Sequence, residues 1–208
     1  MLNNDANPRI LNSYDAERRP HARNMIMLAK FMGKLVMPRN AFFAITLHGI
    51  MKSLQCIPLI RTWFDELGIK PGNRLREGLF VKRRGSLQNG TSFPQAKLRN
   101  MQGKVALSDH LLDHGLALIG LGCNPVDYLS VEARQHFIAA GGRVLHIVSG
   151  DSEQVLMKET WIDDSRVLLA DGGPNGKFVI LRPDHIVLSS GPAEELAAAL
   201  RECIALFE

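Results

Sequence analysis

Apolar residues recur at helical spacing early in the chain and predict a long amphipathic helix. The repeat consists of Met25, Leu28, Ala29, Met32, Leu35 and Val36. Positions three and four residues apart share one face of an α-helix, so we expect residues 8–36 to be mostly helical. Pro20 lacks a backbone donor, and we expect the helix to kink or restart there. Pro38 ends the pattern.

The apolar pattern continues over residues 41–67 and then gives way to a polar segment. The apolar part predicts two short helices. From Pro71 to Gly103 the chain is rich in glycine, arginine, asparagine, glutamine and proline, with a turn signal at Asn89-Gly90. We interpret residues 71–103 as a linker with a possible hairpin.

The last hundred residues alternate between strand-like and helix-like patterns. Residues 116–121 and 144–148 are apolar runs typical of buried strands. Between them, Ser130 is placed to cap a helix that ends at Gly141-Gly142. A strand, a helix and a second strand in this order predict a right-handed parallel unit.

The C-terminal pattern predicts a hairpin followed by a helix. Residues 178–181 and 186–188 flank Arg182-Pro183-Asp184-His185, in which the proline presets the backbone for a tight turn. Pro192 then opens a helix. The apolar face of that helix contains Leu196, Ala199, Leu200, Cys203, Ile204 and Phe207.

These elements together predict an α/β chain whose C-terminal domain is thioredoxin-like, because their order is βαβ followed by ββα. We expect three regions along the sequence: a helical segment over residues 1–70, the linker over 71–103, and the thioredoxin-like domain over 104–208. The apolar stripe of the first helix needs a cover, which we expect to come from this chain, from a second copy or from a domain outside it.

Composition and charge exclude several classes of protein. With 208 residues, of which 46% are hydrophobic, the chain can bury a core. It has no apolar stretch of about 18 residues, and its start is too polar for a secretory signal, so we expect a cytoplasmic protein with no membrane segment. The net charge of +4 is mild, and its basic residues are not interleaved with aromatic ones, so we expect no nucleic-acid binding. The three cysteines are too few for a disulfide framework.

Cys123 is the first candidate for chemistry, because it follows a buried strand and precedes a helix, where a thioredoxin-like domain carries its reactive thiol. Val126 stands where a resolving cysteine would be. No cationic neighbour in the sequence indicates a lowered thiol pKa. We therefore favour inert packing for Cys123 and keep a reactive, one-cysteine thiol as the alternative.

Two further patterns are weaker. The sequence Gly120-Leu121-Gly122-Cys123-Asn124-Pro125 partly matches a dinucleotide fingerprint, but a proline replaces the third glycine. Asp109, His110, Asp113 and His114 offer metal ligands. The strand that follows them leaves room for only about one helical turn, so we expect a solvated turn and no metal site.

Four motifs place the chain beside a known family. They are Tyr14-Asp15-Ala16-Glu17-Arg18-Arg19-Pro20-His21, Ile57-Pro58-Leu59-Ile60-Arg61-Thr62-Trp63-Phe64, Gly120-Leu121-Gly122-Cys123-Asn124-Pro125 and Arg182-Pro183-Asp184-His185-Ile186-Val187. Their order and spacing resemble the C-terminal part of the 3-(3-hydroxyphenyl)propionate hydroxylases and their phenol hydroxylase relatives. The chain departs from that group between Asp171 and Phe178, where a short loop replaces a helix.

The resemblance implies a parent enzyme that hydroxylates a phenolic ring with FAD, NAD(P)H and O2, the flavin carrying the chemistry. It also implies that residues 1–70 correspond to the end of a flavin domain, the rest of which lies upstream. The residues that match the family's helix pattern and its terminal hairpin carry over no flavin or catalytic position, so we assign no catalytic, cofactor-binding or metal residue to this chain. We expect the chain alone to be inactive and to form a homodimer. The alternative is a stand-alone, redox-inactive module for interaction or dimerisation.

Overall fold

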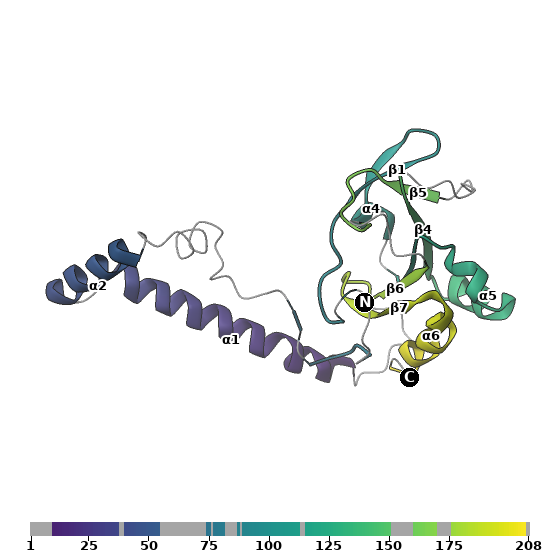
Figure 1. Ribbon diagram of the computed structural model, residues 1–208. Coiled ribbons are helices and arrows are strands. Elements are labelled where there is room, and N and C mark those ends of the chain that lie inside the picture. Colours follow the sequence, from purple (N-terminus) through teal and green to yellow (C-terminus); the bar gives the residue numbers. More distant parts are fainter. Residues whose placement is uncertain are drawn as a thin grey trace. The chain divides into compact units, whose positions relative to one another are not determined.

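The structure is a computed structural model of the chain (Figure 1). It describes residues 10–37, 40–54, 74–75, 77–81, 87, 89–112, 115–150, 160–169 and 176–206. Contacts divide the chain into two compact units, one containing Asn12–Asn73 and the other containing Arg74–Glu208. We call them the helical unit and the sheet unit.

Within the described residues, the helical unit contains two helices. Helix α1 spans Ile10–Val36, and α2 spans Ala41–Leu54. The predicted helix over residues 8–36 is confirmed over its described part, and α1 continues through Pro20 without a restart. The second helix predicted over 41–67 lies outside the described residues. No described helix combines the length and the apolar character needed to cross a lipid bilayer.

In the part of the chain that the structure describes, the sheet unit is built on one mixed sheet of seven strands in the order β2-β1-β5-β4-β3-β6-β7. The strands are β1 Lys97–Asn100, β2 Val105–Leu107, β3 Ala117–Leu121, β4 Arg143–Ser149, β5 Thr160–Asp163, β6 Lys177–Leu181 and β7 Val187–Pro192. The helices are α4 Ser108–Leu112, η1 Pro125–Tyr128, α5 Val131–Ala139, η2 Ala193–Glu195 and α6 Leu196–Ala205.

The topology confirms the predicted thioredoxin-like arrangement. Strands β3 and β4 are parallel and are joined through α5, which Ser130 caps by accepting a hydrogen bond from the Ala133 backbone N–H at 3.2 Å. Strands β6 and β7 form the predicted antiparallel hairpin beside β3. The four strands therefore lie in the order β4-β3-β6-β7, and α6 follows the hairpin.

Side chains alternate between the two faces of β3 and divide the core in two. One cluster contains Ile119 together with residues of β1, β4, β6 and α4. The other contains Leu118 together with residues of α5 and α6. Along α6 the predicted apolar face is buried at Leu196, Ala199, Leu200 and Cys203. The prediction was wrong for Ile204, which is 42% exposed, because it lies at the margin of that face.

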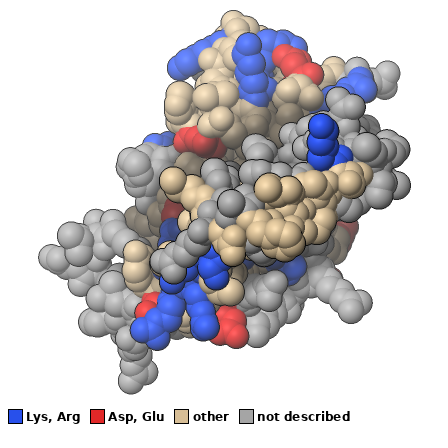
Figure 2. Space-filling view, turned by 90° about the vertical axis from the view of Figure 1, so that its left-hand side faces the viewer, with Lys and Arg blue, Asp and Glu red and all other residues tan. Residues whose placement is uncertain are grey.

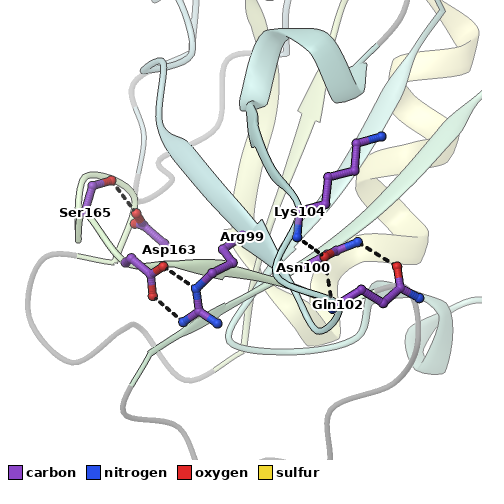
Figure 3. Close-up of polar contacts among 7 residues, drawn as sticks. Arg99, Asn100, Gln102, Lys104, Asp163 and Ser165 are labelled. Atoms are coloured by element: carbon purple, nitrogen blue, oxygen red, sulfur yellow. Dashed lines mark hydrogen bonds and ion pairs between the residues drawn. The ribbon is translucent and has the colours of Figure 1, made fainter.

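Three strands were not predicted from the sequence. Strands β1 and β2 pair as an antiparallel hairpin, and β1 also pairs with β5. Arg99 on β1 and Asp164, just after β5, form a two-pronged ion pair, with nitrogen to oxygen distances of 2.7 and 2.9 Å (Figure 3). The sheet thus includes residues that precede position 104.

The turn after β5 is organised by a buried carboxylate. Asp163 is fully buried, and its Oδ1 accepts a hydrogen bond from the Ser165 hydroxyl at 2.7 Å (Figure 3). Its Oδ2 accepts from the backbone N–H groups of Leu168 at 2.7 Å and Leu169 at 3.2 Å. These bonds hold the segment that brings Leu169 into the core, because a buried carboxylate is tolerated only when its oxygens are hydrogen-bonded.

Candidate functional site

The end of β3 leads into the turn that contains Cys123. Gly122 has a φ of 67°, and its N–H donates to the Ile147 carbonyl at 2.8 Å, which prolongs the pairing of β3 with β4. The Asn124 side chain accepts from the Val126 N–H at 3.3 Å and so caps η1. Cys123 therefore stands where the sequence places it, between a buried strand and a short helix.

The surroundings of Cys123 favour the neutral thiol. The side chain is half-buried, and its Sγ donates to the Lys177 carbonyl at 3.4 Å. Burial, followed by the negative charges of Glu194 and Asp127, raises the pKa of Cys123 to about 11. At pH 7 only about one molecule in ten thousand then carries a thiolate, the nucleophilic form.

His146 is a neighbouring polar group that the sequence did not single out. It lies on β4 opposite Gly120, and its Nδ1 is 3.2 Å from the Thr160 hydroxyl. Its Nε2 is buried and has no hydrogen-bond partner among the described residues. Burial lowers the pKa of His146, an effect that Asp127 partly opposes. A nucleophilic Cys–His pair needs a thiolate and an imidazolium, whereas here both groups are held neutral.

The raised pKa predicts slow alkylation of Cys123. At pH 8, iodoacetamide should modify Cys123 in the folded chain about 100-fold more slowly than in the urea-unfolded chain, because two pKa units reduce the thiolate about 100-fold. Peptide mass spectrometry over a time course measures the rate at this residue separately from the other cysteines. If Cys123 is alkylated as fast in the folded chain as in the unfolded chain, or faster, the result would support the alternative that Cys123 is a reactive thiol.

Gly120 serves the packing of the turn and not a nucleotide. A Cβ at this position would overlap the carbonyl oxygen of Cys123 and would approach Pro125 Cδ to 2.5 Å. The chain itself therefore fills the space into which a pyrophosphate would have to enter. The helix that follows, η1, has only four residues and offers no extended dipole. The partial dinucleotide match thus reflects a tight turn.

Of the potential metal ligands around α4, Asp109 is engaged in other contacts. Asp109 accepts a hydrogen bond from the Gln95 side chain at 2.7 Å and lies 3.9 Å from His185 Nδ1. His110 is exposed, and Asp113 and His114 lie outside the described residues. Among the residues that the structure describes, no group of three or more His, Cys, Asp and Glu side chains could hold a metal ion.

The Arg182-Pro183-Asp184-His185 turn is built as a structural clamp. The Arg182 guanidinium donates to both carboxylate oxygens of Asp184, at 3.0 and 2.6 Å, and its Nη1 donates to the Leu79 carbonyl at 3.4 Å. His185 takes a φ of 60°, and its N–H donates to the Arg182 carbonyl at 2.9 Å. The motif thus closes the β6–β7 hairpin and holds a segment that is about a hundred residues earlier in the sequence.

The motif in α1 is largely exposed within this chain. Tyr14 is 62% exposed. Arg19 and Asp15 form an ion pair at 3.4 Å between side chains that are 77% and 67% exposed. Farther along the helix, Met27 and Phe31 are 60% and 56% exposed.

On the face drawn in Figure 2, basic side chains lie beside acidic ones, as the mild net charge of +4 leads one to expect.

Comparison with known families identifies the sheet unit. Residues 90–206 match the family described as the HcaD C-terminal domain. The chain belongs to this family. The match covers more than half of the 208 residues and includes β1 to β7 and α6. The predicted resemblance to the C-terminal part of the hydroxylases is thereby confirmed.

Proteins similar to this member of the HcaD C-terminal domain family are named as hydroxylases. The 3-(3-hydroxy-phenyl)propionate/3-hydroxycinnamic acid hydroxylase of Escherichia coli strain SMS-3-5 is 27% identical over 214 residues, which is 97% of this chain and 38% of the relative. The chain thus spans little more than a third of the length of the curated relatives it matches.

Two solved structures share the fold across the same extent. The flavin-dependent monooxygenase PieE, solved with FAD and substrate, is 16% identical, with a TM-score of 0.54, and the match covers 97% of this chain and 41% of that one. Aklavinone-11 hydroxylase, solved with FAD and aklavinone, gives the same identity and TM-score, with 97% of this chain and 36% of that one covered.

Proposed function

We propose that this chain acts as the C-terminal portion of an FAD-dependent monooxygenase that hydroxylates a phenolic aromatic compound with NAD(P)H and O2. The observation that carries the proposal is the alignment of 97% of the chain with enzymes named as hydroxylases of hydroxyphenylpropionate and hydroxycinnamic acid. In such an enzyme the flavin supplies the oxygen chemistry when it is bound, and the protein holds and orients the reactants.

We assign this portion a role in structure and in subunit contacts. The turn most similar to a nucleotide site is filled by Pro125 and by the Cys123 carbonyl, so these residues do not fit the pyrophosphate of FAD. The remaining polar groups of that region hold its own turn together. FAD and the phenolic ring are therefore expected to bind outside the described residues, in the parent enzyme.

The proposal predicts that the isolated chain neither retains flavin nor oxidises NADH. After incubation with FAD and removal of the excess by gel filtration, its visible spectrum should lack flavin bands. NADH consumption should not respond to 3-(3-hydroxyphenyl)propionate, because a folded thioredoxin-like domain supplies no flavin site. Stoichiometric flavin retention or substrate-stimulated NADH oxidation would refute the assignment of a purely structural role.

A chimera tests the role in the parent enzyme. The region of the Escherichia coli hydroxylase that this chain matches is replaced by the chain, and substrate-stimulated NADH oxidation is compared with that of a truncated enzyme lacking the region. We expect the chimera to retain FAD and to exceed the truncated enzyme in activity. A chimera equal to the truncated enzyme would favour the stand-alone interaction module instead.

The exposed apolar residues of the helical unit support a homodimer. Helix α1 exposes Met27 and Phe31, and α2 exposes Phe42 and Ile45, at 78% and 74%. Exposed apolar surface of this kind is typical of protein contacts. Light scattering of the purified chain should give a dimer mass, and Phe31→Asp should shift it toward the monomer. Val131→Asp, at a comparably exposed site on α5, is the matched control. A wild-type chain that is monomeric would contradict the proposal.

A further inference from the structure

The outer edge of β7 is occupied by an earlier segment of the same chain. We call residues 79–81, 87 and 89–93 the edge strap. The Gly90 N–H donates to the Val187 carbonyl, and the Val187 N–H donates to the Thr91 carbonyl, both at 2.9 Å. In Figure 1 this teal segment leads on into β1, at the other side of the sheet. The strap therefore makes with β7 the kind of backbone hydrogen bonds that a neighbouring strand makes.

A β-bulge in β7 extends this pairing. Ile180 pairs with Ser189 and Leu181 pairs with Val187, so Leu188 is an extra residue with no counterpart on β6. Its carbonyl oxygen accepts a hydrogen bond from the Val81 N–H at 2.9 Å. The bulge thus turns one more backbone acceptor toward the strap.

Side chains add specificity to the backbone pairing. The Ser190 side chain is buried, with the residue 1% exposed, and its hydroxyl donates to the Leu87 carbonyl at 2.7 Å and accepts from the Leu87 N–H at 3.3 Å. The Asn89 amide donates to the Val81 carbonyl, which ties residues 79–81 of the strap to residues 89–93. Gly90 has a φ of 80°, and a Cβ there would lie 2.5 Å from the Leu75 carbonyl oxygen. These contacts therefore depend on an asparagine at position 89 and a glycine at position 90 of the strap.

Unpaired edge strands offer backbone donors and acceptors to any extended chain, and proteins cover them to prevent such pairing. We propose that the edge strap masks a strand-pairing surface on β7, and that the occupant this surface fits when the strap is released is the edge strap of a second copy of the chain. A second copy fits this surface because its strap has the same Leu87 main chain to bond Ser190, the same Asn89 side chain to bond Val81 and the same turn at Gly90.

The surface is tested with a fluorescent synthetic peptide of residues 79–93 and four proteins: the wild type, Gly90→Ala, Gly103→Ala and the double variant Gly90→Ala/Ser190→Ala. Gly90→Ala weakens the strap, because it introduces both an unfavourable positive φ and a clash with the backbone. Gly103→Ala is the matched control, because its φ is 81° and nothing lies within 4 Å of its Cβ position. In the wild type the chain's own strap competes with the peptide for the edge of β7. Because the strap is tethered to the same chain, its effective concentration at that edge is high.

Peptide binding measured by fluorescence anisotropy should be at least about ten-fold tighter to Gly90→Ala than to the wild type or to Gly103→Ala, since loss of one or two hydrogen bonds corresponds to roughly that factor. Hydrogen exchange should show faster exchange at the Val187 amide in Gly90→Ala, reversed by the peptide. Adding Ser190→Ala to Gly90→Ala should weaken the peptide again, because the hydroxyl that holds Leu87 is gone.

Equal peptide affinity for Gly90→Ala and Gly103→Ala would overturn the proposal, as would tight binding that survives the Ser190→Ala change. If Gly90→Ala does not fold, as judged by circular dichroism, Asn89→Ala takes its place, since it removes a tie within the strap and leaves β7 intact. Tighter peptide binding to Asn89→Ala than to Gly103→Ala would then support the proposal that the strap masks the edge of β7, and unchanged binding would refute it.

Discussion

Replacing Phe178 by alanine should lower the free energy of unfolding of the sheet unit by about 4 kcal/mol, the usual cost of removing a buried aromatic ring. Phe178 is fully buried in the cluster beneath α5 and α6. It pairs across the sheet with Gly120 on β3 and with Gly191 on β7, and Gly191 leaves room for its ring. A Cβ at Gly191 would lie only 3.2 Å from the ring.

Urea denaturation of the wild type, Phe178→Ala and Phe178→Leu measures this effect. The leucine variant should lose less, because it refills part of the cavity. Val131→Ala is the control for an apolar truncation at the surface, since Val131 is 67% exposed, and it should change stability by less than about 0.5 kcal/mol. A loss for Phe178→Ala below about 1 kcal/mol would mean that the core collapses around the cavity.

Replacing Asp163 by alanine should cost about 3 kcal/mol, because it leaves the backbone N–H groups of Leu168 and Leu169 without their acceptor. The Ser165 hydroxyl loses its acceptor as well. Asp163→Asn should be milder, since one oxygen remains to accept. The adjacent Asp164→Ala is the matched control: it breaks only the ion pair with Arg99, between side chains 48% and 41% exposed, and such surface pairs contribute at most about 1 kcal/mol.

Denaturation curves followed by tryptophan fluorescence are suited to this comparison, because Trp161 lies on β5, next to the affected turn. The free energy of unfolding should be highest for Asp164→Ala, lower for Asp163→Asn and lowest for Asp163→Ala. An Asp164→Ala variant less stable than Asp163→Ala would show that the exposed ion pair, and not the buried carboxylate, determines the stability of this turn.

Three of the four strands that were predicted from the sequence carry apolar runs buried on both faces. Residues 117–121 of β3 are all buried, and β6 and β7 are nearly so. Strand β1, with the sequence Lys-Leu-Arg-Asn, buries only Leu98, and β2 has three residues. Such short, partly exposed strands have too few apolar positions to show a period of two.

The sequence predicts the position of Cys123 but not the charged groups that surround its thiol. The sequence places Cys123 after a strand, yet the groups that hold its thiol neutral include Glu194, which is about seventy positions away and is brought near by the fold. His146 lies inside an apolar run and gives no sign of its hydrogen bond to Thr160. Segment 71–103 resembles a linker by composition. Its Leu79 and Leu87 carbonyls accept hydrogen bonds from the side chains of Arg182 and Ser190, about a hundred positions later, and local patterns do not reveal such contacts.

The contact between Leu87 and Ser190 joins residues that are 103 positions apart, and this separation has a consequence for synthesis on the ribosome. At about 5–20 residues per second, the edge strap leaves the ribosome roughly 5–20 s before β7 follows it. During that interval the apolar sequence Leu79-Phe80-Val81 has no β7 to pair with. The nascent chain is then open to pairing with neighbouring chains on the same messenger RNA, and translation speed becomes a determinant of how much correctly strapped protein is made.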